Sequence, residues 1–276
     1  MYIKEIKGTF LALFFVTTVL SLFQWLCPRP GEPIPVPASE TFEPGLTYLT
    51  SVDRATRWLD STAAIRGIKP ASRQYVDLAD TLVRLRFVHG YSYYRPSDDV
   101  ISYLLGRVVW SHLSAIVDPD DILKFNNAAC SQQAIVFMAL LRRKGYRTRT
   151  VGLKGHFCTG VFYEGQWHFY DPNKEPRFRR DRPVPSSLEL MSDKNLAYQA
   201  YRGIMSKSQV DTLFSKVTLD ESAALPGYRV RILHNITYFM SHFGWAVMWL
   251  GYLLSFVAER FLRVKYVRHY RVPVIQ

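Results

Sequence analysis

Two long stretches without charged side chains stand out in the hydrophobic pattern of the chain. They cover residues 8–27 and 232–258, and Leu, Phe, Val and Trp occur in both. A helix rises about 1.5 Å per residue, so about 20 residues cross the hydrocarbon core of a bilayer. Both stretches are therefore predicted to be transmembrane helices.

The first stretch has one feature of a cleaved signal peptide, because Lys4 and Lys7 precede it. A cleavage site needs small residues, whereas this stretch ends with Trp25 and Leu26. The same bulky residues disfavour a lipoprotein signal at Cys27. A retained span is therefore the preferred interpretation.

Basic residues near the ends of the two stretches predict how the chain is oriented. Lys4 and Lys7 precede the first stretch, and five basic residues follow the second: Arg260, Arg263, Lys265, Arg268 and Arg271. Such residues stay on the cytoplasmic side of a membrane. The two spans are therefore expected to lie in an inner (plasma) membrane, with residues 1–7 and 259–276 on its cytoplasmic side. The segment between the spans is expected in the periplasm or outside the cell.

The segment between the spans divides into three parts by composition. Residues 28–50 begin with five prolines in ten positions, which favours an extended linker without hydrogen-bonded structure. Residues 51–176 form the predicted globular domain, and residues 177–231 form a helical extension. At 276 residues and 48% apolar content, the chain is large enough for one such domain with a core.

Within the domain the spacing of apolar residues changes from helical to strand-like. Helical spacing covers residues 51–85 with a break at 67–70, then about 98–116. A further helix is predicted from the capping residues Asn126 and Asn127, through the apolar run at 134–141, to the basic residues at 142–144 and Gly145. Short strands follow at 147–153, 156–163 and 166–170, and Glu164-Gly165 predicts a tight turn between the last two. Helical spacing returns at 188–205 and 209–217. The predicted class is α+β, with a helix packed on an antiparallel sheet.

The formal net charge of +12 raises the question of nucleic-acid binding. The C-terminal tail carries much of this charge, where it suits topology and contact with anionic lipid head groups. A second cluster predicts a solvated loop, or a surface for an acidic glycan, a head group or a protein: Arg177, Arg179, Arg180 and Arg182. The expected partner is therefore the lipid bilayer, and no nucleic acid is expected.

The cysteines point to chemistry more than to a disulfide framework. Three are too few for such a framework, and an odd number leaves at least one thiol without an intramolecular partner. Cys130 falls at the start of a predicted helix, where free N–H groups and the helix dipole favour a thiolate. His156 begins one hairpin strand and Asp171 follows its partner, so the two are expected side by side. The three suit the roles of nucleophile, base and orienting residue.

The sequence around these residues resembles the transglutaminase-like superfamily. Its cysteine box is similar to residues 127–149, which read NAACSQQ and end in LLRRKGYRTR. Its His and Asp boxes are similar to GH at 155–156 and GQWHFYDP at 165–172. The resemblance covers about residues 75–176. It implies a papain-like core and relatedness to crosslinking enzymes, cysteine peptidases, amidases and peptide deglycosylases, as well as to members that have lost activity.

Two features differ from the pattern of that superfamily. Many members have a Trp and an acidic residue after the histidine, where this chain has Phe157-Cys158-Thr159. This leaves the substrate class open. The side chain that would stabilise an oxyanion is also unassigned. Oxyanion or cleft candidates are Asn126, Asn127, Ser131 and Cys158.

Other residues that could carry chemistry have simpler interpretations. Cys158 shares a strand face with His156, so it is either a core residue or a cleft residue that could form an inactivating disulfide with Cys130. A metal site of these three residues lacks the usual paired-ligand spacing, so neither a metal nor another cofactor is expected. His168 alternates to the face opposite Asp171 and is expected to be exposed.

The resulting prediction is a membrane-anchored, extracytoplasmic cysteine hydrolase or acyltransferase. Its substrate would be an amide or ester in an envelope peptide, protein, glycan or acylated polymer. The alternative is an inactive accessory subunit or scaffold of a glycan-synthesis or export complex, bound to an integral-membrane partner through the two spans. His234 and His242, within or beside the second span, could be proton-relay or ligand groups, but packing or partner contacts are the preferred interpretation.

Overall fold

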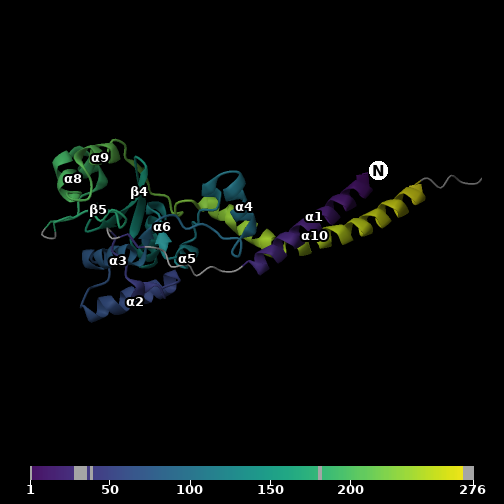
Figure 1. Ribbon diagram of the computed structural model, residues 1–276, viewed down its shortest axis with the longest axis horizontal. Coiled ribbons are helices and arrows are strands. Elements are labelled where there is room, and N and C mark those ends of the chain that lie inside the picture. Colours follow the sequence, from purple (N-terminus) through teal and green to yellow (C-terminus); the bar gives the residue numbers. More distant parts are fainter. Residues whose placement is uncertain (1, 28–35, 38–39, 180–181, 270–276) are drawn as a thin grey trace, which may run out of the picture. The chain divides into compact units, whose positions relative to one another are not determined.

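The computed structural model describes residues 2–27, 36–37, 40–179 and 182–269 (Figure 1). The predictions for the prolines at 28–35, for Arg180 and for Arg271 lie outside these residues. The fold is α+β with an antiparallel sheet, as predicted. The described residues form two compact units. One contains the sheet and consists of residues between 32 and 92 and between 115 and 231, and the other contains the two long apolar helices and residues 93–114.

Three helices of the sheet-containing unit follow the predicted pattern. They are α2 (Val52–Ile65), α3 (Arg73–Arg86) and α6 (Cys130–Arg143). Ser51 and Ser72 cap the first two, and each hydroxyl accepts a hydrogen bond from a backbone N–H three residues later. α6 is the central helix, because it contacts α2, α3, the short helix α5 (Pro119–Ile122) and the sheet. A short 3₁₀ turn, η1 (Pro44–Leu46), precedes them.

The sheet has four antiparallel strands in the order β5-β4-β3-β6. Strands β3 (Arg147–Leu153), β4 (His156–Tyr163) and β5 (Gln166–Tyr170) have the predicted bounds, whereas β6 (Thr218–Asp220) was not predicted. Glu164 and Gly165 both have positive φ, 50° and 81°, as a tight hairpin turn with right-handed strand twist requires. A separate two-residue pairing joins β1 (Val88–His89) to β2 (Asn127–Ala128) in parallel.

Helices cover both faces of this sheet. On one face, Tyr170 packs against Phe137 of α6, with ring centroids 5.6 Å apart. On the other, Phe169 packs against Phe214, within a core shared with three helices: α7 (Ser187–Ser192), α8 (Lys194–Ala200) and α9 (Lys207–Leu213). Residues 177–231, expected as a separate helical extension, supply both a strand and one helical layer of the same compact unit.

The described residues of the arginine-rich segment lie at the surface of this unit. Arg177, Arg179 and Arg182 are all exposed. Backbone contacts fix the two ends of the segment: the N–H of Arg177 donates to the carbonyl of Ala200, and the carbonyl of Arg182 accepts from Arg73.

The other unit is built on two long helices, α1 (Tyr2–Leu26) and α10 (Tyr228–His269). They lie side by side and antiparallel (Figure 1), because Lys7 pairs with Glu259 while Ser21 donates to the carbonyl of Ser241 at 2.6 Å. Each helix is long and apolar enough to cross a membrane.

A buried carboxylate joins residues 93–114 to the two long helices. Asp99 caps α4 (Val100–Val108) and is fully buried. It accepts hydrogen bonds from the hydroxyls of Thr237 at 2.6 Å and Ser241 at 2.8 Å, while Gln24 of α1 accepts from the N–H of Val100 at 3.1 Å. The start of α4 is therefore held by both helices.

The helix expected over residues 98–116 is shorter than predicted. α4 ends at Val108, and a 3₁₀ turn, η2 (Ser111–Leu113), follows. The chain turns back so closely that a Cβ at Gly106 would lie 2.1 Å from the hydroxyl oxygen of Ser114. The carbonyl of Leu113 then lies 2.9 Å from Nε2 of His234, which is a packing position within the unit.

Candidate active site

Cys130 is the first residue of α6, and Gln132 fixes its position. The buried Gln132 side chain makes four hydrogen bonds with the backbone. Its Oε1 accepts from the N–H groups of Ser92 at 2.9 Å and Ala129 at 3.1 Å. Its Nε2 donates to the carbonyls of Ser92 at 2.9 Å and Ile116 at 2.8 Å. The start of the helix is thereby tied to two other segments of the same unit.

His156 and Asp171 form a hydrogen-bonded pair on one hairpin. His156 is the first residue of β4, and Asp171 directly follows β5. Nε2 of His156 lies 2.9 Å from each carboxylate oxygen of Asp171, and both side chains are buried. Because Nε2 faces the carboxylate, Nδ1 is the ring nitrogen left for another partner.

Two further donors hold the Asp171 carboxylate. The hydroxyl of Tyr201 donates to Oδ2 at 2.9 Å, and the backbone N–H of Lys174 donates to Oδ1 at 3.1 Å. Tyr201 lies just after α8 and is fully buried. A buried carboxylate with three donors keeps its charge and its orientation.

The electrostatics of the three residues favour an ionised pair. Burial alone would raise the pKa of Asp171, but the charge and hydrogen bonds of His156, Lys174 and Tyr201 lower it overall. Burial alone would lower the pKa of His156, but the neighbouring carboxylate raises it well above its usual value. Burial would likewise raise the pKa of the Cys130 thiol, yet His156 and the N–H of Phe157 lower it. The expected state is a thiolate beside an imidazolium.

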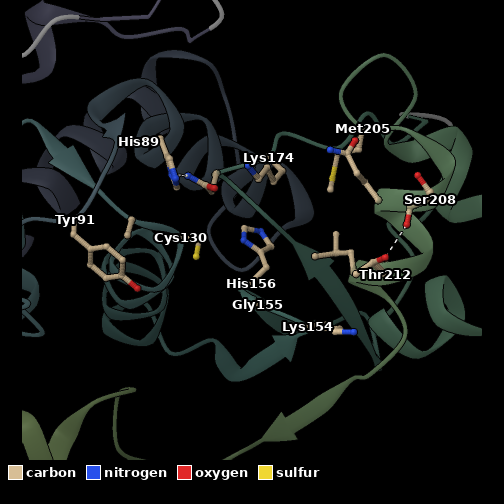
Figure 2. Close-up of a pocket in the computed structure, with 14 residues that line it drawn as sticks. His89, Tyr91, Cys130, Lys154, Gly155, His156, Lys174, Met205, Ser208 and Thr212 are labelled. Carbon is tan, nitrogen blue, oxygen red and sulfur yellow. Dashed lines mark hydrogen bonds between the residues drawn. The ribbon is translucent and has the colours of Figure 1, made fainter. Parts of the chain in front are cut away.

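Figure 2 shows Cys130 and His156 on the wall of one cleft, with the sulfur and the imidazole side by side. The cleft has a volume of about 530 Å³. His89, Tyr91 and Asn173 line it beside Cys130, and Met205 with residues of α9 lines the opposite side. Such a cleft could hold a short extended segment of a polymer against the sulfur.

Comparison with protein-family models, curated proteins and solved structures finds no match for this chain. Any functional assignment therefore depends on the geometry and chemistry of the site itself.

The two cysteines near His156 have different environments. Cys130 lines the cleft, whereas Cys158 is fully buried in the core between β4 and α7–α9. Burial raises the pKa of Cys158 well above its usual value, so this thiol stays protonated. Both thiols are free. Cys130 is therefore the reactive candidate of the two.

His156, Cys158 and Asp171 also have the residue types of a metal site. Their candidate ligand atoms lie within 4.8 Å of one another, and all three residues are buried. However, His156 and Asp171 are bonded directly to each other, and Tyr201 and Lys174 occupy the same carboxylate. A metal would have to displace these hydrogen bonds, so the arrangement suits an oriented base better than a metal centre.

The other predicted oxyanion candidates lie outside the cleft. Asn126 accepts from Arg86 at 3.3 Å, and the amide of Asn127 donates to the carbonyl of Tyr91 at 2.7 Å. Ser131 is also not among the cleft residues. The donors near the sulfur are instead backbone groups, namely the N–H of Phe157 and those at the start of α6.

The prediction that His168 is exposed is wrong. His168 is buried, with Nδ1 2.6 Å from the carbonyl of Val184 and Nε2 3.2 Å from that of Tyr163. Its ring also stacks on Tyr163, with centroids 3.7 Å apart. Its strand, β5, is covered on both faces of the sheet. The side chain of His168, which alternates away from Asp171, is therefore buried and does not face solvent.

Several site residues were not found from the sequence. Tyr201 has no motif and lies 30 positions from its partner Asp171. His89 lines the cleft, and its Nδ1 lies 2.6 Å from the Asn173 amide. Burial and the Lys174 charge lower the pKa of His89, so it is expected to be neutral. The only sequence signal for Asn173 and Lys174 was their position just after the Asp-Pro pair.

Proposed function

We propose that this protein is a cysteine-dependent hydrolase or acyltransferase, with Cys130 as nucleophile, His156 as general base and acid, and Asp171 as the orienting carboxylate. The observation that carries the proposal is the meeting of a low-pKa thiol at a helix start with an imidazole held by a buried carboxylate, on the wall of one cleft.

In the first half of the reaction the Cys130 thiolate attacks the carbonyl carbon of an amide or ester. A carbon–sulfur bond forms, and the negative charge on oxygen is stabilised by the N–H groups at the start of α6. The imidazolium of His156 then gives its Nδ1 proton to the leaving nitrogen or oxygen. The original acyl bond breaks and a thioester remains.

In the second half His156 takes a proton from water or from an amine. The resulting nucleophile attacks the thioester, the carbon–sulfur bond breaks, and the thiolate and imidazolium are restored. Water as acceptor gives a hydrolase, and an amine gives a transferase. Asp171 keeps Nε2 in place throughout, which leaves Nδ1 directed at the sulfur.

A papain-like core of the transglutaminase-like type fits this proposal. A helix that starts with the nucleophile packs on an antiparallel sheet whose hairpin carries the base and the carboxylate, in the chain order Cys, His, Asp. The two long apolar helices would anchor the enzyme in a membrane with both termini in the cytoplasm. The catalytic unit would then act on the periplasmic or extracellular side.

A thiol-reactive activity probe tests the proposal on the full-length protein in detergent or nanodiscs. Wild type is expected to be labelled at neutral pH on Cys130, as located by mass spectrometry. Cys130→Ala abolishes this labelling, and Cys158→Ala serves as the matched control that retains it. Unreactive Cys130 in folded protein would refute the proposal.

A non-catalytic membrane scaffold is the second candidate function. It is favoured by the tight hydrogen-bonded connection of α4 to both apolar helices and by the aromatic side chains exposed on α10, among them Tyr238, Phe239 and Phe243. These could contact an integral-membrane partner. In cells, a scaffold would function equally well with Cys130→Ala, whereas an enzyme would not.

A further inference from the structure

Positive side chains line the cleft, and negative ones other than the ionised Cys130 do not. Lys154 and Lys174 both line it, and no Asp or Glu is among its lining residues. His89 also lines the cleft, and burial lowers its pKa, so its neutral form is favoured. The net charge that a substrate meets in the cleft is therefore positive, apart from the ionised cysteine and its imidazolium.

The two lysines are placed by the same local structures that place the catalytic residues. Lys154 lies in the turn that enters β4, two residues before His156, and its N–H donates to the carbonyl of Leu213 at 3.2 Å. Lys174 lies three residues after Asp171 and binds it through its backbone N–H. Figure 2 shows the two lysines on opposite sides of His156. A bound acyl group would thus pass between them.

Neighbouring carboxylates are bound to other groups. Glu40 accepts from the N–H of His89 at 2.6 Å, and Glu175 pairs with Arg84 at 3.2 Å. Asp211 of α9 accepts from the hydroxyl of Tyr198 at 2.7 Å. Among the residues that the structure describes, no carboxylate lies within ion-pair distance of Lys154 or Lys174. Their charges remain available to a ligand.

We infer that the acyl donor is anionic, with a carboxylate or a comparable acidic group close to the scissile carbonyl, and that Lys154 and Lys174 select it. An acidic peptide segment has this chemistry. The inference rests on the proposed function, because it concerns what approaches the Cys130 sulfur. Opposite charges attract a ligand over several ångströms, while a basic or neutral donor gains nothing from the lysines.

Two small alkylating agents test this without knowledge of the natural substrate. Iodoacetate is anionic and iodoacetamide is neutral, and both react when a thiolate displaces iodide to form a carbon–sulfur bond. The measured quantity is the ratio of their rates at Cys130, followed by mass spectrometry on the full-length protein. The ratio for free glutathione is the reference. We expect the ratio for Cys130 to exceed this reference by about three- to tenfold for each lysine.

Substitutions and salt identify the cause. Lys154→Gln and Lys174→Gln should each lower the ratio, Lys174→Glu should lower it further, and the exposed Lys69→Gln outside the cleft is the matched control that leaves it unchanged. In wild type the ratio should fall as salt rises from 20 to 500 mM, because salt screens exposed charges. This last measurement does not depend on any variant folding correctly.

The possible failures are distinguishable. If neither agent alkylates Cys130, the proposed nucleophile is wrong. If both agents react at Cys130 but their ratio equals that of glutathione and is insensitive to salt and to both lysines, the enzyme proposal survives and the anionic donor is refuted.

Discussion

The hydroxyl of Tyr201 donates a 2.9 Å hydrogen bond to the Asp171 carboxylate, and neither residue is among those that line the cleft. In the proposed enzyme, Tyr201 would therefore act through Asp171 and His156 and not by contact with a substrate in the cleft. It is a positioning residue, and it belongs to the segment beyond residue 176 that the sequence resemblance does not reach.

Replacement of Tyr201 by Phe should weaken the site without unfolding the protein. The change removes one of the hydrogen bonds that lower the pKa of Asp171, so this pKa rises. A hydrogen bond to a charged group contributes about 1.5–3 kcal/mol. We expect a roughly three- to thirtyfold slower alkylation of Cys130 at neutral pH, with an acid limb displaced to higher pH. An unchanged pH profile would contradict a positioning role.

The same variant should show a pH-dependent loss of stability. A carboxylate with a lowered folded pKa stabilises the protein above its unfolded value of about 3.9, and this contribution disappears as pH falls through the folded value. The difference in unfolding free energy between wild type and Tyr201→Phe should thus reach its maximum by pH 7 and be smaller at pH 3. Tyr198→Phe, which affects an exposed hydroxyl, is the control.

His156 should control the ionisation of Cys130. The pKa of Cys130 is lowered by His156 against the opposing effect of burial. In wild type the thiolate should persist below the usual thiol pKa of about 8.5, so alkylation remains fast at pH 7. In His156→Ala the effect of burial dominates, and the alkylation profile should move up by about one pH unit or more. His168→Ala tests whether a buried imidazole elsewhere on the sheet has the same effect, and no shift is expected.

Gln132 should be essential for the folded position of the nucleophile. Its four hydrogen bonds are buried, so Gln132→Leu leaves several backbone groups without partners. Each unsatisfied buried group costs about 1–3 kcal/mol, and the total should exceed about 3 kcal/mol. Urea denaturation measures the loss. The neighbouring Gln133 donates only to the carbonyl of Ala128, and Gln133→Leu should cost much less.

Asp99 should govern the local stability of residues 93–114. Asp99→Ala removes the N-cap of α4 and the acceptor for the Thr237 and Ser241 hydroxyls, at a cost of about 2–4 kcal/mol. We expect faster tryptic cleavage after Arg107 in detergent, without loss of Cys130 alkylation. Asp98→Ala should leave the cleavage rate close to that of wild type.

Local patterns in the sequence were sufficient for much of the fold. Strands β3, β4 and β5 occur at the predicted bounds, because period-two spacing is preserved there and Glu164-Gly165 marks the turn. Helix α6 lies where a helix was predicted and ends before Gly145, but Ala129 and not Asn126 or Asn127 is its N-cap. The hairpin also predicts which residues become neighbours across the two strands. His156 and Asp171 are neighbours of this kind, and they are hydrogen-bonded.

Features that depend on distant contacts were not predictable in the same way. The pairing of β1 with β2 involves two residues on each strand, separated by 39 positions, and has no periodic signal. α4 stops early because Gly106 packs against Ser114, a contact that helical spacing does not show. Tyr201 is one of 17 tyrosines, and only the packing of α8 on the sheet places it at Asp171.

The hairpin of β4 and β5 has a consequence for the order in which the protein matures. Base and carboxylate are only 15 positions apart on one hairpin, whereas the sulfur arrives with a helix whose first turn must dock on Ser92 and Ile116. Hairpins close within microseconds, ahead of long-range docking. A newly synthesised chain would thus hold a complete imidazole–carboxylate pair while its thiol was still an ordinary, weakly reactive one. Under the proposed function, the reactivity of Cys130 would appear only with the last long-range contacts.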